Sequence, residues 1–159
     1  MAAKKSAPLP ELSPAKQLDG FIDKFAPEIC KLIRMGRREL RKRMPTAFEL
    51  VYDNYNALAI GFAATERTAT VLISLAGFAR GVNLYFYYGA HLPDPLKILL
   101  GSGTQGRFIR LEGLETFKKA GVEALIKASM KYAEPSLARS EKGVLIIKSI
   151  SARQRPRRI

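Results

Sequence analysis

The sequence predicts an α+β domain in which an antiparallel sheet of about four to five strands is packed by N-terminal and C-terminal helices. Two stretches, residues 17–43 and 114–133, repeat apolar side chains at the spacing of one helix face. Between them, three segments of strand length follow one another with short turns. Because strands joined by short turns pair antiparallel, we expect a meander that the flanking helices cover.

The size and cysteine content of the chain fit one domain in a reducing compartment. With 159 residues, of which 47% are hydrophobic, the chain can bury a sizeable core. Cys30 is the single cysteine, so no disulfide can form within the chain. The sequence has neither the apolar run of a signal peptide nor a charge-free apolar stretch of roughly 18 residues. We therefore expect a cytoplasmic protein without a membrane span.

The N-terminal part of the chain is expected to form a leader and two helices. Residues 1–15 carry three prolines among small and charged side chains, which is typical of a flexible leader. Ser13 is the candidate N-cap of the first helix, with Pro14 at its first helical position. Pro27 then starts a second helix that runs towards Arg43, because the first turn of a helix tolerates a missing N–H.

The second helix concentrates positive charge in a chain whose 27 Lys and Arg against 14 Asp and Glu give a formal charge of +13. Three interpretations stay open: a solvated helix face, a face that contacts phosphates, or a face that contacts an acidic protein. The residues expected to bind a polyanion are Arg34, Arg37, Arg38, Arg41, Lys42 and Arg43, together with Arg155, Arg157 and Arg158.

The middle of the chain is expected to supply the sheet. Residues 46–53 are predicted to be helical, because their apolar side chains fall at helical spacing. The meander strands are predicted at residues 57–63, 70–75 and 82–88. Alternation in the last of these places Tyr85 and Tyr87 on one face, which is either covered by helices or exposed as a stacking platform.

The C-terminal part is expected to add a fourth strand at residues 107–111 and a long helix at residues 114–133. Residues 144–150 are predicted to be an edge strand or a docked tail, and the arginine-rich end is predicted to be disordered. These expectations divide the chain into a leader, 1–15, a main domain, 16–134, and a C-terminal extension with a basic tail, 135–159.

The glycines of residues 101–106 match the G-x-G-x-x-G pattern of dinucleotide-binding proteins, but the order of elements is wrong. That site needs a strand before the glycines and a helix after them. Here the strand follows, so we expect Gly101 and Gly103 to serve a tight turn through positive φ angles. A small anion nest of backbone N–H groups beside Arg107 is the alternative.

The sequence predicts no specific reaction and no cofactor. His91 is the single histidine and has no nucleophilic partner nearby in the sequence. His91 and Cys30 lack the spacing of metal ligands, so no metal site is predicted. Glu49 and Asp53, four residues apart, could share an ion, but a solvated or ion-paired couple is the simpler interpretation. An enzyme of unrecognised type stays an alternative.

Several short motifs together resemble the YdhG-like family, a domain of unknown function. The residues that carry the resemblance are Pro45, Glu49 and Tyr52, then Leu92, Asp94 and Pro95, then Leu100, Gly101, Gly103, Arg107 and Ile109. The resemblance covers residues 18–133 and implies a compact α+β fold with an antiparallel sheet. It also implies that Glu49, Tyr52, Gly101, Gly103 and Arg107 line a shared ligand-binding cleft. Some relatives are labelled iron chaperones, similar in function to frataxin.

Three functions follow from these observations. The first is a non-enzymatic YdhG-like binding domain that holds a small anionic ligand or a partner segment in the cleft. The second is a basic protein that associates with nucleic acid through the basic helix and the tail. The third is a frataxin-like iron chaperone, against which the net positive charge argues because cations are repelled.

Overall fold

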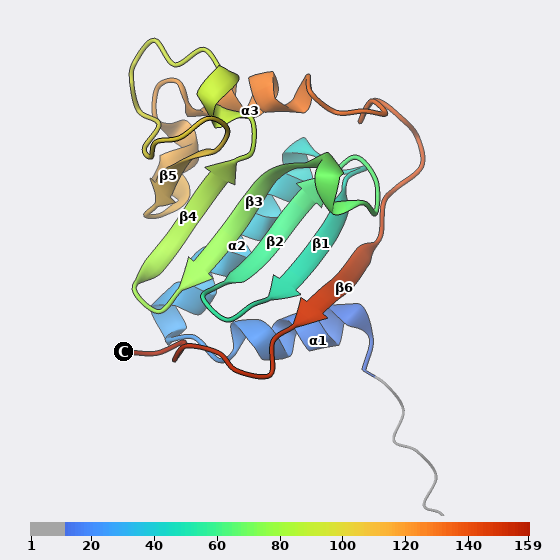
Figure 1. The fold of residues 1–159 in the computed structure, drawn as a ribbon, viewed down its shortest axis with the longest axis vertical. Coiled ribbons are helices and arrows are strands. Elements are labelled where there is room, and N and C mark those ends of the chain that lie inside the picture. Colours follow the sequence, from blue (N-terminus) through green and yellow to red (C-terminus); the bar gives the residue numbers. More distant parts are fainter. Residues whose placement is uncertain (1–11) are drawn as a thin grey trace, which may run out of the picture.

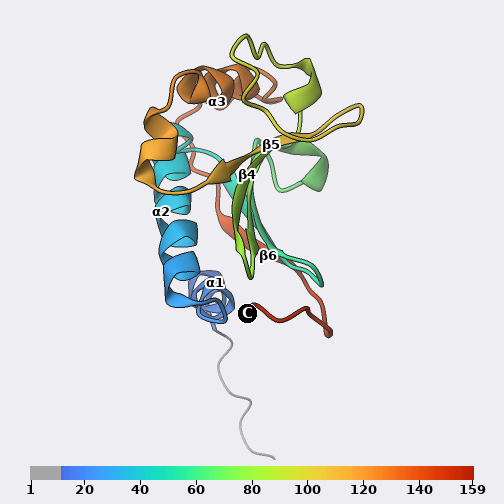
Figure 2. The ribbon, with the colours of Figure 1, turned by 90° about the vertical axis from the view of Figure 1, so that its left-hand side faces the viewer.

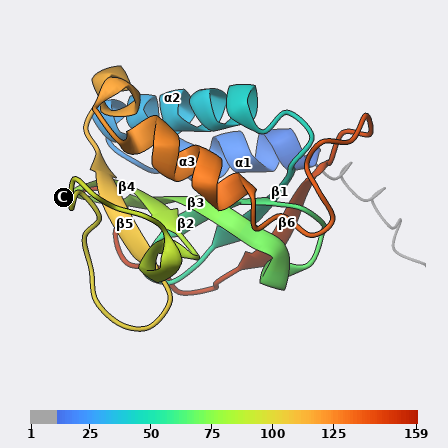
Figure 3. The ribbon, with the colours of Figure 1, turned by 90° about the horizontal axis from the view of Figure 1, so that it is seen from above.

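A computed structural model describes residues 12–159 of the chain. It confirms the predicted α+β class: the helices α1, α2 and α3 form one layer that lies against one face of a six-stranded sheet (Figures 1 and 2). Seen from above in Figure 3, the helix layer covers the full width of the sheet. The sheet is larger than the four to five strands expected.

The two N-terminal helices begin where the sequence predicts. Helix α1 spans Pro14–Ile22, and the Ser13 hydroxyl accepts a hydrogen bond of 3.3 Å from the Lys16 N–H. Helix α2 spans Pro27–Arg43, with a carboxylate in its first turn and three basic residues in its last. The charges at both ends of α2 interact favourably with the helix dipole. Residues 14 and 15, assigned to the leader, belong to α1, and the rest of the leader up to residue 11 lies outside the described residues.

The sheet is mixed, because one of its strands is parallel to its neighbour. The strand order is β5-β4-β3-β2-β1-β6, and every pair is antiparallel except β1 with β6. The strands are β1 Phe48–Asp53, β2 Leu58–Ala63, β3 Val71–Phe78, β4 Gly81–Phe86, β5 Arg107–Leu111 and β6 Leu145–Ile150. Short 3₁₀ turns are η1 Thr68–Thr70, η2 Gly89–His91 and η3 Leu114–Lys118, and the third helix, α3, spans Val122–Met130.

Residues 46–53 were expected to be helical, and this prediction is wrong: residues 48–53 form β1. Helical spacing and strand alternation are hard to separate in so short an apolar run. The tertiary structure decides in favour of the strand, because β1 pairs with β2 on one side and β6 on the other. Glu49 and Asp53 consequently point to the helix layer, while Leu50 belongs to a small cluster on the opposite face.

Two predictions about the C-terminal part are also wrong. The long helix expected at residues 114–133 is broken into η3 and α3. The break lies at Gly121, whose φ of 89° is left-handed. The basic tail, expected to be disordered, is ordered: Arg157 is 5% exposed, and the preceding strand β6 pairs with β1. The prediction of an edge strand at residues 144–150 is confirmed.

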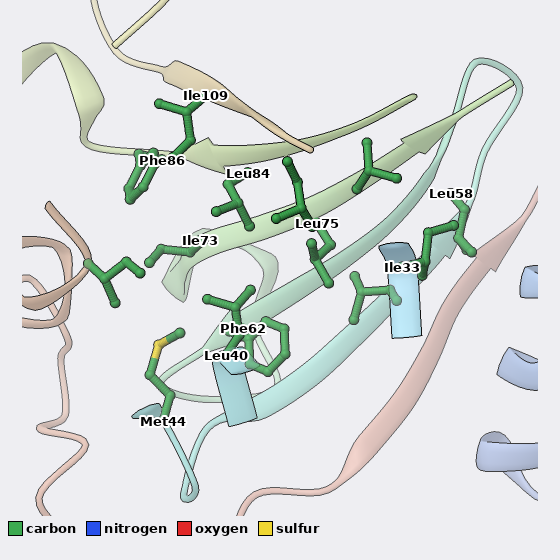
Figure 4. Packing of buried hydrophobic residues seen from close by; sticks show 14 of the residues in the cluster. Ile33, Leu40, Met44, Leu58, Phe62, Ile73, Leu75, Leu84, Phe86 and Ile109 are labelled. Carbon is green, nitrogen blue, oxygen red and sulfur yellow. The ribbon is translucent and has the colours of Figure 1, made fainter. Parts of the chain in front are cut away.

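The main core lies between the helix layer and the sheet (Figure 4). Ile33, Leu40 and Met44 from the α2 side meet Phe62 and Leu84 from the strands. A Cβ atom on Gly36 of α2 would lie 2.7 Å from side-chain carbons of Leu75 and Leu111, so α2 approaches the sheet closely. The core therefore fixes the position of α2, whose other side carries the arginines.

The opposite face of the sheet carries a second, smaller cluster. Leu50, Ala63 and Val71 are buried there, and Tyr52 and Tyr87 pack against them. All three α-helices of the described residues lie on the other side (Figure 2), so helices do not cover Tyr87. Within residues 12–159, no helix combines the length and apolar character that crossing a membrane requires.

Candidate functional site

A groove lined by arginines runs between α1 and α2. Its volume is about 530 Å³, and five cations and one carboxylate line it together with an apolar side chain. The lining residues are Asp19, Ile22, Arg34, Arg37, Arg38, Arg41 and Lys42. Residues three, four and seven apart lie on one face of a helix, which explains why α2 presents these cations together. Sequence analysis predicted these five cations as polyanion-binding residues, together with Arg43 and three arginines of the tail.

The buried carboxylate of Glu49 holds two of the groove arginines in place. Arg37 Nε lies 2.6 Å from Glu49 Oε1, and Arg41 Nε lies 3.5 Å from Glu49 Oε2. Glu49 comes from β1 and is almost fully buried, whereas the side chain of Arg41 is 57% exposed. Glu49 therefore orients guanidinium groups whose outer N–H groups still face solvent.

The other cations of the groove differ in how far they are neutralised. Arg34 pairs with Asp23 at 2.8 Å, and this hydrogen bond raises the pKa of Arg34. Lys42 pairs with Glu39 at 2.9 Å, which lowers the pKa of the Glu39 carboxyl. Arg38 has no ion-pair partner within residues 12–159. Arg38 is therefore the cation of the groove that is most available to an incoming anion.

Arg43, also predicted to bind a polyanion, contributes to the packing of the helix layer. Its guanidinium group pairs with Glu123 of α3 at 2.9 Å and with Glu39 at 3.4 Å. It also lies 4.8 Å from the centre of the Phe117 ring, within the range of a cation–π contact. Arg43 thus connects α2 to α3 and does not line the groove.

The three predicted arginines of the tail have different surroundings. Arg157 is buried and pairs with the fully buried Asp53 at 3.0 Å, so it faces the interior. Arg155 lies over the Tyr55 ring, and Arg158 donates hydrogen bonds to the backbone carbonyls of residues 23 and 24. Because Asp23 also pairs with Arg34, Arg158 lies near the start of the arginine groove.

Asp53 is the residue that holds the tail. Lys24 Nζ lies 2.7 Å from Asp53 Oδ2, and Arg157 donates to Asp53 Oδ1. Burial raises the pKa of the Asp53 carboxyl, but hydrogen bonds from Lys24, Gln154 and Arg157 outweigh burial and lower it below its ordinary value. Sequence analysis could not predict the pair of Asp53 and Arg157, because 104 residues separate its members.

The predicted shared cleft of Glu49, Tyr52, Gly101, Gly103 and Arg107 does not form. Glu49 and Tyr52 lie on opposite faces of β1, and the Tyr52 hydroxyl lies 2.6 Å from that of Thr68. Arg107 lies on β5, which is separated from β1 by the three strands β4, β3 and β2. Neighbouring strands are roughly 4.8 Å apart, so the sheet itself separates the two groups.

The glycines near Arg107 have the structural role predicted for them. Gly101 and Gly103 adopt φ angles of 105° and 100°, which confirms the expectation of a turn with positive φ. The Arg107 guanidinium group donates to the carbonyls of Gly103 at 3.0 Å and Gly106 at 2.7 Å. Arg107 therefore stabilises this turn through backbone oxygens.

The residues that sequence analysis considered for metal binding lie apart. His91 is exposed in η2, whereas Cys30 is buried with its sulfur 3.0 Å from the Ile22 carbonyl. Within the described part of the chain, no three His, Cys, Asp or Glu side chains gather into a group that could hold a metal ion.

Comparisons with protein-family models, with curated proteins and with solved structures found no match. The resemblance to the YdhG-like family therefore stays a prediction. The candidate site rests on the geometry of this chain alone.

Proposed function

We propose that this protein is a binding domain and that the arginine groove of α2 takes an anionic, phosphate-bearing ligand. The observation that carries this proposal is the convergence of Arg34, Arg37, Arg38 and Arg41 on one groove of about 530 Å³. This volume lies within the range of small-molecule sites, roughly 300–1,000 Å³. Guanidinium groups match phosphate oxygens in geometry and charge, and they keep their charge at every physiological pH.

The ion pairs of Glu49 with Arg37 and Arg41 support the same proposal. Glu49 holds Arg37 and Arg41 before any ligand arrives, so part of the entropic cost of ordering these side chains is already met. Arg38 supplies positive charge that no carboxylate of the described residues neutralises. Within residues 12–159, the site thus combines oriented donors with one cation that no carboxylate pairs with.

Calorimetric titration of inorganic pyrophosphate at low salt tests the proposal. We expect Arg38→Gln to weaken binding about tenfold, because one charge-assisted hydrogen bond contributes about 1.5–3 kcal/mol and 1.4 kcal/mol is a factor of ten. Arg80→Gln is the matched control, since Arg80 is exposed at the turn between β3 and β4 and does not line the groove. An equal loss in both variants, or no heat with the unchanged protein, would contradict the proposal.

Nucleic acid is the second candidate ligand, and the position of Arg158 favours it. Arg158 extends the positive surface of the groove past Asp23 towards the C-terminus. A phosphodiester backbone would then contact both segments, and its affinity would fall steeply with salt. Fluorescence anisotropy of labelled single-stranded and duplex oligonucleotides distinguishes this case. The double variant Arg38→Gln, Arg158→Gln should reduce the salt slope, whereas pyrophosphate binding should depend on Arg38 and not on Arg158.

We also propose that the chain is a YdhG-like domain of the cytoplasm. The α+β architecture and the short motifs of residues 45–109 support the first part. The single, free and buried cysteine supports the second, because it suits a reducing compartment. The frataxin-like alternative gains no support from residues 12–159, where the buried carboxylates of Glu49 and Asp53 pair with Arg and Lys.

A further inference from the structure

A second pocket is lined by residues of β5, η3, α3 and the loop of residues 92–106. Figure 1 shows these elements close together at the edge of the sheet that β5 forms. Its volume is about 270 Å³. Ile98, Leu100, Ile109 and Val122 give it an apolar lining. This volume is just below the range of drug-sized sites, roughly 300–1,000 Å³, so the pocket has room for a small molecule.

The wall of this pocket is fixed without a ligand. The Asp94 carboxylate accepts hydrogen bonds of 3.0 Å from the N–H groups of both Ile98 and Leu99. Leu100 and Phe108 exchange two backbone hydrogen bonds of 2.8 and 3.0 Å, which attach the loop to β5. A pocket that is preformed in this way loses little entropy when it binds a ligand.

Apolar side chains also remain exposed around the pocket. Leu100, which lines it, is 43% exposed, and Leu96 on the same loop is 55% exposed. Leu114, the first residue of η3, is 44% exposed. Grouped apolar exposure of this kind costs solubility and commonly marks a binding site.

The polar groups of the pocket favour a negative charge. Arg110, Lys119 and Glu112 line it, and none of them makes an ion pair within the described residues. Two cations against one carboxylate leave a positive balance. The buried Thr116 hydroxyl accepts a 3.1 Å hydrogen bond from the Glu112 N–H, so its own proton is available to a ligand oxygen.

We propose that this pocket binds a small carboxylic acid with an aliphatic body. The aliphatic part packs against Ile98, Ile109 and Val122, where it is removed from water. The carboxylate lies at the rim, where Arg110 and Lys119 pair with it. This ligand class differs from that of the arginine groove, because five cations and one apolar side chain line the groove, whereas four apolar side chains and two cations line this pocket.

The proposal is tested by titrating the protein with hexanoate and monitoring its amide chemical shifts by NMR. Hexylammonium and 1-hexanol are the control ligands of matched length. We expect hexanoate to shift the amides of residues 98, 109 and 122, and to bind at least several-fold more tightly than either analogue. The double variant Arg110→Gln, Lys119→Gln should weaken hexanoate about tenfold. Lys118→Gln is the matched control, since Lys118 is exposed beside the pocket and does not line it.

Leu100→Trp tests the apolar part. The side chain is exposed, so the change leaves the core intact, and a larger ring at the mouth should abolish the hexanoate shifts. Equal binding of hexanoate and hexylammonium, or shifts unaffected by Leu100→Trp, would overturn the proposal. A concentration-dependent dimer that produces the same shifts without hexanoate would overturn it in favour of self-association. Arg38→Gln should leave hexanoate affinity unchanged, so the failure of either site can be recognised separately.

Discussion

Strand β1 carries two buried carboxylates on the same face, one near each end, and they pair with different parts of the molecule. At one end, Asp53 pairs with Lys24 and with Arg157, whose side chain is only 4% exposed. At the other end, Glu49 pairs with Arg37 and with Arg41, whose side chain is 57% exposed. Both carboxylates are buried and ion-paired, and each has a partner that reaches solvent, because the side chain of Lys24 is 41% exposed. Only the partners of Glu49 line a groove.

The difference shows how to separate a structural ion pair from a binding surface. A buried carboxylate that pairs with a buried cation of a distant segment fastens two segments together, here β1 and the C-terminal tail. A buried carboxylate whose partners line a groove instead orients those partners towards a ligand. The buried guanidinium group of Arg157 therefore distinguishes the Asp53 end, and the groove lined by Arg37 and Arg41 distinguishes the Glu49 end.

The largest expected effect comes from breaking the Asp53 end. Asp53→Asn keeps the shape of the side chain but leaves Lys24 and Arg157 without their counter-charge. Removing one partner of a buried ion pair typically costs about 3–5 kcal/mol, and we expect that loss in the free energy of unfolding measured with urea. Asp19→Asn, at an exposed position of α1 without an ion pair in the described residues, should change it by less than about 0.5 kcal/mol. A loss below about 1 kcal/mol for Asp53→Asn would contradict the structural role.

Acid should weaken the same end of β1. The pKa of Asp53 is lower in the folded state than its ordinary value. The unfolded chain therefore binds this proton at a higher pH than the folded protein does. The stability from Asp53 is complete above the ordinary carboxyl pKa, about 3.9, and is lost as the pH falls below that value. Urea midpoints between pH 7 and pH 2.5 should show the gap between the unchanged protein and Asp53→Asn narrowing; a constant gap would show that Asp53 does not titrate as described.

Changing the Glu49 end should have a smaller effect on stability and a clear one on binding. Glu49→Gln removes a charged acceptor that Arg37 and Arg41 share, at a cost of about 1.5–3 kcal/mol. It also releases Arg37 and Arg41, which Glu49 orients, so we expect pyrophosphate and oligonucleotides to bind more weakly because these side chains must be ordered on binding. Asp53→Asn, measured under conditions where it stays folded, should leave these affinities unchanged. If both substitutions alter binding equally, the distinction between the two ends fails.

The smallest effect on stability is expected at Arg38. Because Arg38 is exposed and unpaired within residues 12–159, Arg38→Gln should change the free energy of unfolding by less than about 0.5 kcal/mol. Arg37→Gln, which unpairs buried Glu49, should cost more than Arg38→Gln in the same urea measurement. Equal costs for the two variants would mean that Glu49 does not discriminate between the groove arginines.

Sequence reasoning located most elements but failed where a distant contact chose the conformation. The alternation of Val82, Leu84 and Phe86 and the capping of α1 by Ser13 are local features, so both predictions hold. Residues 48–53 are equally compatible with a helix, and only pairing with β2 and β6 makes them a strand. The break at Gly121 was missed because a single glycine interrupts an apolar pattern without changing its period.

The candidate site shows the same division. The spacing of Arg34, Arg37, Arg38 and Arg41 on one helix face follows from the period of the helix, so the sequence identified the cations. It could not show that Glu49 lies under them or that Tyr52 lies on the opposite face of its strand, because both depend on β1 being a strand.

The sequence by itself determined the fold class, the helix that bears the arginines and the positive balance of the whole chain. These features depend on composition and on periods of a few residues, which act before any distant contact forms. The tertiary structure alone decided that Arg157 is buried in an ion pair while Arg38 faces solvent. Asp53 and Glu49 approach their partners only when β1 lies beneath the helices, and the burial that makes each charge pair matter exists only in the folded chain.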